Sequence, residues 1–93
     1  MKVFLVENSY GSYDSFYTSV DKIFKTRIQT EDYITKVREK IKELKVLYDN
    51  LSDDRYDKTY TVYYNVIEQF NIDFPDTIYD ISNSFRITER ELE

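Results

Sequence analysis

Hydrophobic and polar positions change their period several times along this chain of 93 residues, and each change predicts an element. Residues 2–7 contain a short apolar run that is typical of a buried strand. Residues 7–19 are rich in Ser, Asn, Asp and Tyr, which indicates a turn-rich connection of about a dozen residues. Apolar residues return near Phe24, so a second strand is expected over residues 19–26. The two strands would pair as an antiparallel hairpin with a long loop.

The clearest periodic segment is residues 30–51, where apolar residues recur with alternating spacings of three and four. This spacing defines one face of an α-helix. We expect Thr30 to be the N-cap, with Glu31 and Asp32 in the first turn, where the helix dipole favours acidic side chains. The apolar stripe consists of Ile34, Val37, Ile41, Leu44, Tyr48 and Leu51.

Residues 54–71 fit two interpretations. The stretch 59–64 has strand propensity and partial alternation, but helical spacing of apolar residues extends further, to Phe70. No Gly or Pro interrupts the segment before Pro75. We therefore predict a second helix over residues 53–71, capped by Ser52 or Asp53 and antiparallel to the first helix. Its apolar positions are Tyr56, Tyr60, Tyr63, Ile67 and Phe70.

The C-terminal segment 85–92 alternates between apolar and polar residues, which predicts a third strand after a connector over residues 78–84. The element order β-β-α-α-β indicates one α+β domain over residues 1–93, with a small antiparallel sheet packed on a helical hairpin. The expected core consists of Val3, Leu5, Val20, Phe24, Ile34, Val37, Ile41, Leu44, Tyr48, Leu51, Tyr60, Tyr63, Ile67, Phe70, Phe85 and Ile87.

The residue inventory removes most enzyme chemistries from consideration. The chain has no His, no Cys and no Trp, so it has no imidazole base, no thiol nucleophile and no zinc site of the usual kind. Gly11 is the only glycine, which excludes a phosphate-binding loop. Clusters of Asp and Glu occur, but none has the spacing of a calcium loop. We expect no catalytic residues, no metal and no cofactor.

Charge is distributed unevenly along the chain, whose net charge is −5. Residues 1–45 hold nine Lys/Arg and seven Asp/Glu, whereas residues 46–93 hold four and eleven. The acidic second half disfavours direct nucleic-acid binding, because phosphates would be repelled. The absence of Cys is typical of a reducing compartment, and the N-terminal apolar run is too short for a membrane span. We therefore expect a cytoplasmic protein without a membrane partner.

Aromatic residues around Gly11 are the strongest candidates for a partner contact. Tyr and Ser on one loop form a common recognition composition, because Tyr offers a large contact area at low entropic cost. In the alternative, the second strand begins earlier and Phe16 and Tyr17 simply cover the sheet. Tyr64 lies beside the stripe of the second helix and should be exposed. The predicted partner-binding residues are Tyr10, Tyr13, Phe16, Tyr17 and Tyr64, together with the acidic Asp53, Asp54 and Asp57.

A basic stripe follows the outer face of the first predicted helix, at Arg38, Lys42 and Lys45. Such a stripe can contact phosphate or an acidic protein. Glu39 and Glu43 are interleaved with it, however, so we expect a solvated helix face.

Both ends of the chain carry short motifs that resemble a loose group of small, uncharacterised phage and bacterial proteins. That group has an MKVYLV-type start, an SYSDY-like loop, a GVFST-like second strand and an acidic IEEYELD-like end. Here the corresponding segments are residues 1–6, 9–13, 23–26 and 87–92. The chain departs from the group at Asp21 and Lys22, where small or apolar residues are usual. The resemblance implies the β-β-α-α-β order and a phage or prokaryotic origin, and it implies no activity.

Together these patterns favour a small acidic binding protein, phage-encoded and not an enzyme, that docks on a bacterial host protein. It would inhibit or redirect that host protein. The candidate partners include the defence proteins of the host. Three alternatives remain open: a nucleic-acid mimic that blocks a host nuclease, a sensor of a nucleotide or metabolite, and a homo-oligomeric structural subunit. The last would use exposed apolar residues such as Val46.

Overall fold

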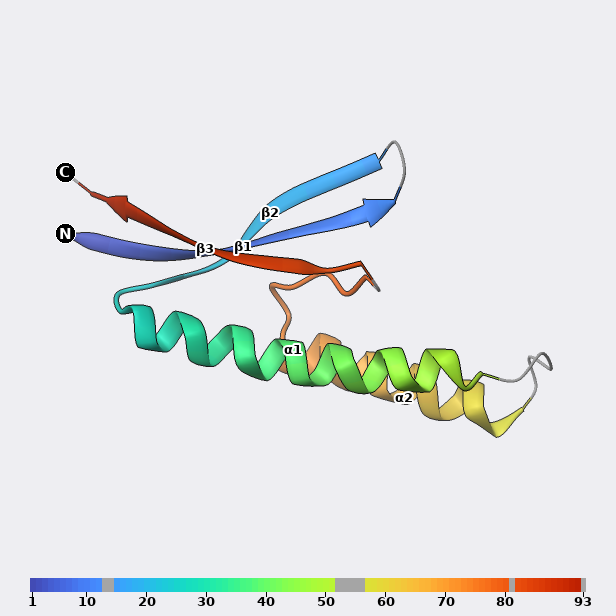
Figure 1. The fold of residues 1–93 in the computed structure, drawn as a ribbon. Coiled ribbons are helices and arrows are strands. Elements are labelled where there is room, and N and C mark those ends of the chain that lie inside the picture. The colour runs from blue at the N-terminus through green and yellow to red at the C-terminus, as the bar shows by residue number, and fades with distance from the viewer. Residues whose placement is uncertain (13–14, 52–56, 81, 93) are drawn as a thin grey trace.

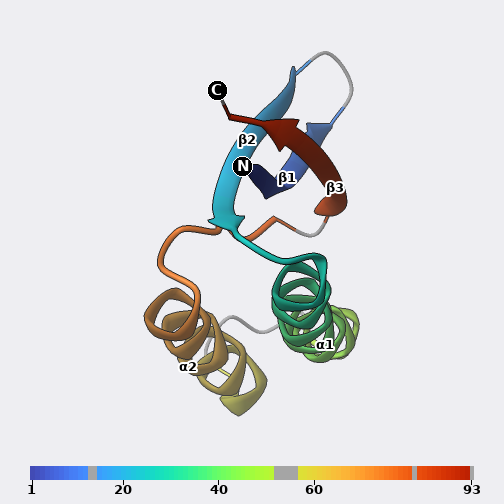
Figure 2. The same ribbon diagram turned by 90° about the vertical axis from the view of Figure 1, so that its left-hand side faces the viewer.

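The computed structural model describes residues 1–12, 15–51, 57–80 and 82–92. Its sheet has the strand order β2-β1-β3, and both pairs of neighbours are antiparallel. Figures 1 and 2 show two antiparallel helices on one side of this sheet. These observations confirm the α+β class and the β-β-α-α-β order. The elements are β1 (Lys2–Ser12), β2 (Ser15–Phe24), α1 (Arg27–Asp49), α2 (Lys58–Asp73) and β3 (Ser84–Glu91).

Strands β1 and β2 are much longer than predicted, and the long loop over residues 7–19 was wrong. Tyr10 pairs with Tyr17 and Gly11 pairs with Phe16, so the connection is confined to a short segment around residues 13–14. The alternative in which the second strand begins earlier is therefore confirmed. Ser and Asn were interpreted as turn formers, but pairing and cross-strand contacts hold them in the ladder. One such contact joins the hydroxyls of Ser9 and Thr18, 3.1 Å apart.

A β-bulge interrupts the β1–β2 ladder at Asp21. Val6 pairs with Lys22, whereas the next residue, Glu7, pairs with Val20. The extra residue reverses which side chains of β2 face the helices. Phe24 packs against the core as predicted, but Val20, four residues earlier, points to the other face and is exposed. The core assignment of Val20 was therefore wrong.

Helix α1 begins earlier than predicted because Thr26, not Thr30, is its N-cap. The Thr26 hydroxyl accepts a hydrogen bond from the Gln29 N–H at 3.2 Å. Thr30 is buried inside the helix and donates its hydroxyl proton to the Thr26 carbonyl. Glu31 and Asp32 consequently lie beyond the first turn, and the dipole argument for them was wrong.

Helix α2 confirms the helical interpretation of the ambiguous segment, but it begins at Lys58. Asp57 is its N-cap and accepts a hydrogen bond from the Thr59 N–H at 2.9 Å. The predicted caps Ser52 and Asp53 lie outside the described residues. The helix ends at Asp73, two residues later than predicted, and Phe74 is its C-cap immediately before Pro75.

The core lies between α1, α2 and the helix-facing side of the sheet. The predicted stripe of α1 is buried from Ile34 to Leu44, but Tyr48 is half-exposed, so its core assignment was wrong. Val6 and Asn8 are fully buried and were not predicted. Val46 and Tyr64 are exposed, as expected. The buried cluster consists of Val6, Ile34, Val37, Ile41, Leu44, Tyr63, Phe70 and Phe85.

Within the described ranges, neither helix has a stretch both apolar enough and long enough to cross a lipid bilayer.

Candidate partner-binding surface

The far end of the β1–β2 hairpin brings three of the predicted contact residues together. Tyr10 and Tyr17 are register partners whose rings stack with their centroids 5.7 Å apart. Phe16 points to the opposite face and is 72% exposed. Figures 1 and 2 show this end of the hairpin projecting away from both helices. The three aromatic side chains therefore lie on a protruding two-stranded ribbon and not on a loop.

The face of the sheet that points away from the helices, here called the open face, carries exposed apolar residues along β2. The bulge places Ile23, Val20 and Phe16 on this same face, opposite Leu5, Glu7 and Gly11 of β1. Ile23 is 61% exposed and Val20 is 50% exposed. Neither helix covers this face, because both helices lie on the other side of the sheet (Figure 2). Thr18 lies between Val20 and Phe16 on this face, so one polar residue interrupts the apolar strip. Exposed apolar residues that lie on one surface are typical of an interaction site.

Gly11 is required by the close approach of the two strands near the hairpin end. Its φ of +120° is rarely adopted by residues with a side chain, and an added Cβ would lie 1.9 Å from the Ser15 carbonyl oxygen. The Gly11 N–H donates to the Ser82 hydroxyl at 2.9 Å. Ser82 therefore accepts a backbone hydrogen bond from β1 beyond the end of the β1–β3 ladder.

A polar network anchors the connector before β3 to the hairpin. The buried Asn8 side chain accepts a hydrogen bond from Asn83 at 2.9 Å, and Asn83 in turn accepts one from the Asp80 N–H at 2.7 Å. The Ser82 hydroxyl and the Ser82 N–H both donate to the Asp80 carboxylate, and these bonds lower the pKa of Asp80. The network fixes Ser82 beneath Gly11 and so positions the hairpin end.

Charged pairs border the open face and the helix-facing side of β2. Arg86 donates to Glu7 across the β1–β3 pair, and this hydrogen bond is the main reason that the pKa of Glu7 is lowered. On the other side, Lys22 pairs with Asp76 at 2.6 Å, which raises the pKa of Lys22. The open face is therefore an apolar strip with a charged pair beside it, the usual composition of a protein interface.

The remaining predicted contact residues do not join this surface. Tyr64 lies on α2, where its ring contacts Tyr60 and Tyr63. Asp57 caps the same helix, and the hydrogen bond from the Thr59 N–H lowers the pKa of Asp57. Tyr13, Asp53 and Asp54 lie outside the described residues. Among the described residues, the predicted acidic contact residue Asp57 therefore does not lie beside the predicted aromatic contact residues of the hairpin.

Sequence reasoning missed the contribution of Val20 and Ile23 to the open face. Both were interpreted as strand residues, and Val20 was assigned to the core. The one available signal was Asp21, a charged residue that directly follows the apolar Val20 within the expected strand. A charged residue there is compatible with a bulge, but it does not specify one.

Comparisons with known protein families, with curated proteins and with solved structures give no match for this chain. In the part of the chain that the structure describes, no three Asp or Glu side chains lie close enough together to hold a metal ion.

Proposed function

We propose that this protein is a small, non-enzymatic binding protein that docks on another protein through the open face of its sheet. The observation that carries this proposal is the exposed strip of Phe16, Val20 and Ile23 on β2, which is an edge strand. Edge strands are normally protected by charges or bulges because they invite pairing. Here the bulge increases the apolar character of the open face, since it adds Ile23 to the face of Val20 and Phe16.

The proposed partner is a bacterial host protein, which the small phage-encoded protein would inhibit or redirect. The resemblance of the two chain ends to small phage and bacterial proteins suggests this source of partner. Phe16 and Ile23 would be the central apolar contacts, and Tyr17 would contribute from the edge of the hairpin.

The test is affinity capture from a bacterial lysate with the tagged chain, at low and at high salt, using matched variants. The double variant Phe16→Ser/Ile23→Ser removes the apolar strip, and Ile72→Ser removes an equally exposed apolar residue on α2, where Ile72 is 70% exposed. We expect one stoichiometric protein, captured at both salts by the wild type and by Ile72→Ser but not by the double variant.

Other outcomes would contradict the proposal in distinguishable ways. Capture only at low salt, with displacement by DNA, would indicate a nucleic-acid mimic. A wild-type dimer in light scattering that the double variant converts to a monomer would show that the open face is a self-association surface. Equal capture by all three proteins would show that the contact lies elsewhere.

A further inference from the structure

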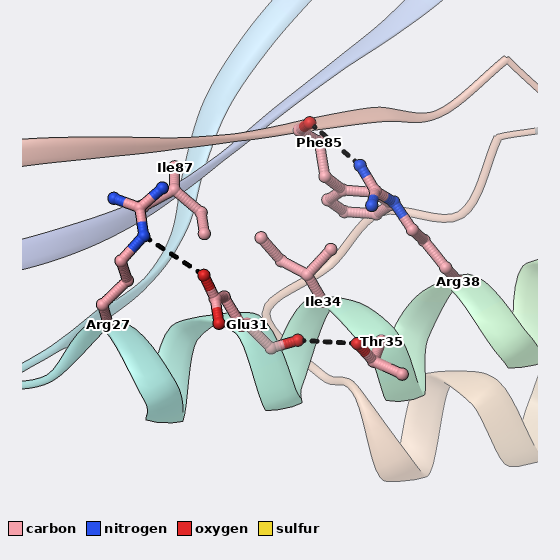
Figure 3. Close-up of a pocket in the computed structure, with 7 residues that line it drawn as sticks. All are labelled: Arg27, Glu31, Ile34, Thr35, Arg38, Phe85 and Ile87. Carbon is pink, nitrogen blue, oxygen red and sulfur yellow. Dashed lines mark hydrogen bonds and ion pairs between the residues drawn. The ribbon is translucent and has the colours of Figure 1, made fainter.

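A second surface, separate from the open face, lies between α1 and the free edge of β3. It is a hollow of about 470 Å³. Figure 3 shows Arg27 and Arg38 at its two ends, with Ile34, Phe85 and Ile87 between them. Ile34 and Phe85 are buried and form an apolar floor, whereas both arginines are exposed. We call this hollow the α1–β3 groove.

The backbone of β3 faces this groove with hydrogen-bonding groups that no described strand pairs. Met1 and Leu92 exchange two hydrogen bonds, of 3.1 and 2.7 Å, so they form a doubly bonded pair. Because bonding alternates along an antiparallel ladder, the backbone groups of Phe85, Ile87 and Glu89 point away from β1. The bond from Arg38 Nη2 to the Phe85 carbonyl, 3.3 Å long, agrees with this direction. The free edge and the apolar floor thus belong to the same residues.

Charge around the groove is asymmetric. At one end, Arg27 is balanced by Glu31 at 3.1 Å and by Glu89 at 3.8 Å. At the other end, Arg38 is followed along α1 by Lys42 and Lys45. Within residues 1–12, 15–51, 57–80 and 82–92, these three cations form no ion pair. The groove is therefore near neutral at the Arg27 end and positive at the Arg38 end.

We propose that the α1–β3 groove binds an extended peptide that adds a strand to β3, with apolar side chains on the floor and acidic residues at the Arg38 end. Strand addition supplies main-chain hydrogen bonds, and the groove supplies selectivity for side chains. Arg27 and Arg38 are separated by eleven residues, about 16 Å along a helix. About five residues of an extended chain span that length. Carboxylates beyond this span would reach Lys42, so the solvated basic stripe expected from the sequence becomes part of a binding site.

A peptide fits these observations better than a nucleic acid. The chain carries a net charge of −5, and Arg27, which is already paired with Glu31 and Glu89, leaves half of the groove near neutral and without attraction for a phosphate backbone. The apolar floor has no counterpart in a phosphate chain.

The test is selection of peptides from a random decapeptide library on the immobilised full chain, followed by fluorescence anisotropy of labelled peptides. We expect the selected peptides to share alternating apolar residues followed by Asp or Glu. Arg38→Glu should weaken their binding about tenfold, because a favourable contact becomes repulsive. The control is Lys36→Glu, a charge reversal of an exposed residue on the same helix that pairs with Asp32, and it should leave affinity unchanged. Thermal unfolding of both variants verifies that they are folded.

Amide chemical shifts locate the bound peptide. The inference predicts changes at Ile87, Glu89 and residues 27–38, and none along residues 16–23. Peptides without acidic residues, equal affinity for Arg38→Glu, or shifts confined to residues 16–23 would overturn it. The last result would assign the peptides to the open face. The chemical shifts therefore distinguish failure of the groove proposal from failure of the proposed function. Pairing of β3 with a second copy would appear as a dimer in light scattering and would also overturn the inference.

Discussion

At the scale of single residues, Gly11 has the most restricted position in the hairpin. We expect Gly11→Ala to lower the free energy of unfolding by about 1–3 kcal/mol, because its φ and the Ser15 carbonyl oxygen both oppose a side chain. Cross-strand contacts between the Tyr10 and Tyr17 rings should weaken as well. Urea unfolding and two-dimensional NMR measure the two effects.

The matched control for Gly11 is Ser9→Ala on the same strand. It removes one exposed hydrogen bond to Thr18 without straining the backbone, so a change below about 1 kcal/mol is expected. Equal stability of Gly11→Ala and the wild type would show that the hairpin end accommodates a side chain.

Asp80 makes the free energy of unfolding depend on pH in the acidic range. Its pKa is lowered in the folded state by the two hydrogen bonds from Ser82, so the carboxylate stabilises the fold above its ordinary pKa of 3.8. That stabilisation is lost as the pH falls through the lower pKa of the folded state. Asp80→Asn should therefore flatten the dependence of unfolding free energy on pH below the ordinary pKa of 3.8.

Denaturant unfolding at several pH values measures the contribution of Asp80. Glu68→Gln serves as the control, since Glu68 makes no hydrogen bond or ion pair with any described residue. An unchanged pH profile for Asp80→Asn would contradict the assignment.

At the scale of elements, the sequence predicted helices whose apolar periodicity extends over several turns. It did not predict features that one local contact determines, such as a helix N-cap or the face of a strand residue. The stripe of α1 runs over several turns, so an error at either end leaves the helix intact. Its N-cap was misplaced because Thr26 and Thr30 have the same chemistry, and only tertiary packing buries Thr30. The face of Val20 could not be inferred, because a single extra residue reverses the alternation of a strand.

The burial of α1 predicts opposite effects for two apolar residues five positions apart. Ile41 is 5% exposed and belongs to the core cluster, whereas Val46 is 55% exposed. Ile41→Asp would bury an unpaired charge at a cost of several kcal/mol, comparable to the whole stability of a small domain. We expect it to abolish the cooperative thermal transition in circular dichroism. Val46→Asp should retain a transition near that of the wild type, and loss of folding in both variants would show that this face of α1 is also covered.

At the scale of the whole molecule, the two candidate surfaces differ in how far the sequence could predict them. Tyr10, Phe16 and Tyr17 are close in the sequence, so their composition identified them although their secondary structure was wrong. The α1–β3 groove joins residues 27–38 to residues 85–87, and only the strand order β2-β1-β3 brings these segments together. A site built across the whole chain has no local pattern, and the basic stripe alone suggested a solvated helix.

The division into a three-stranded centre and a two-stranded end predicts two levels of stability in one molecule. The β1–β3 ladder ends at Ser9 and Ser84, so the hairpin beyond it has only two strands and exposes Phe16 and Tyr17. Two-stranded ribbons are marginal without further packing, and such regions open locally. Hydrogen exchange should therefore be faster at the amides of Tyr10 and Tyr17 than at those of Val37 and Leu44 in α1. The α1 amides should exchange only through global unfolding, at the free energy measured by urea. Equal protection at both places would show that the hairpin end is stabilised as strongly as the core, and the protruding surface would then be rigid before it meets a partner.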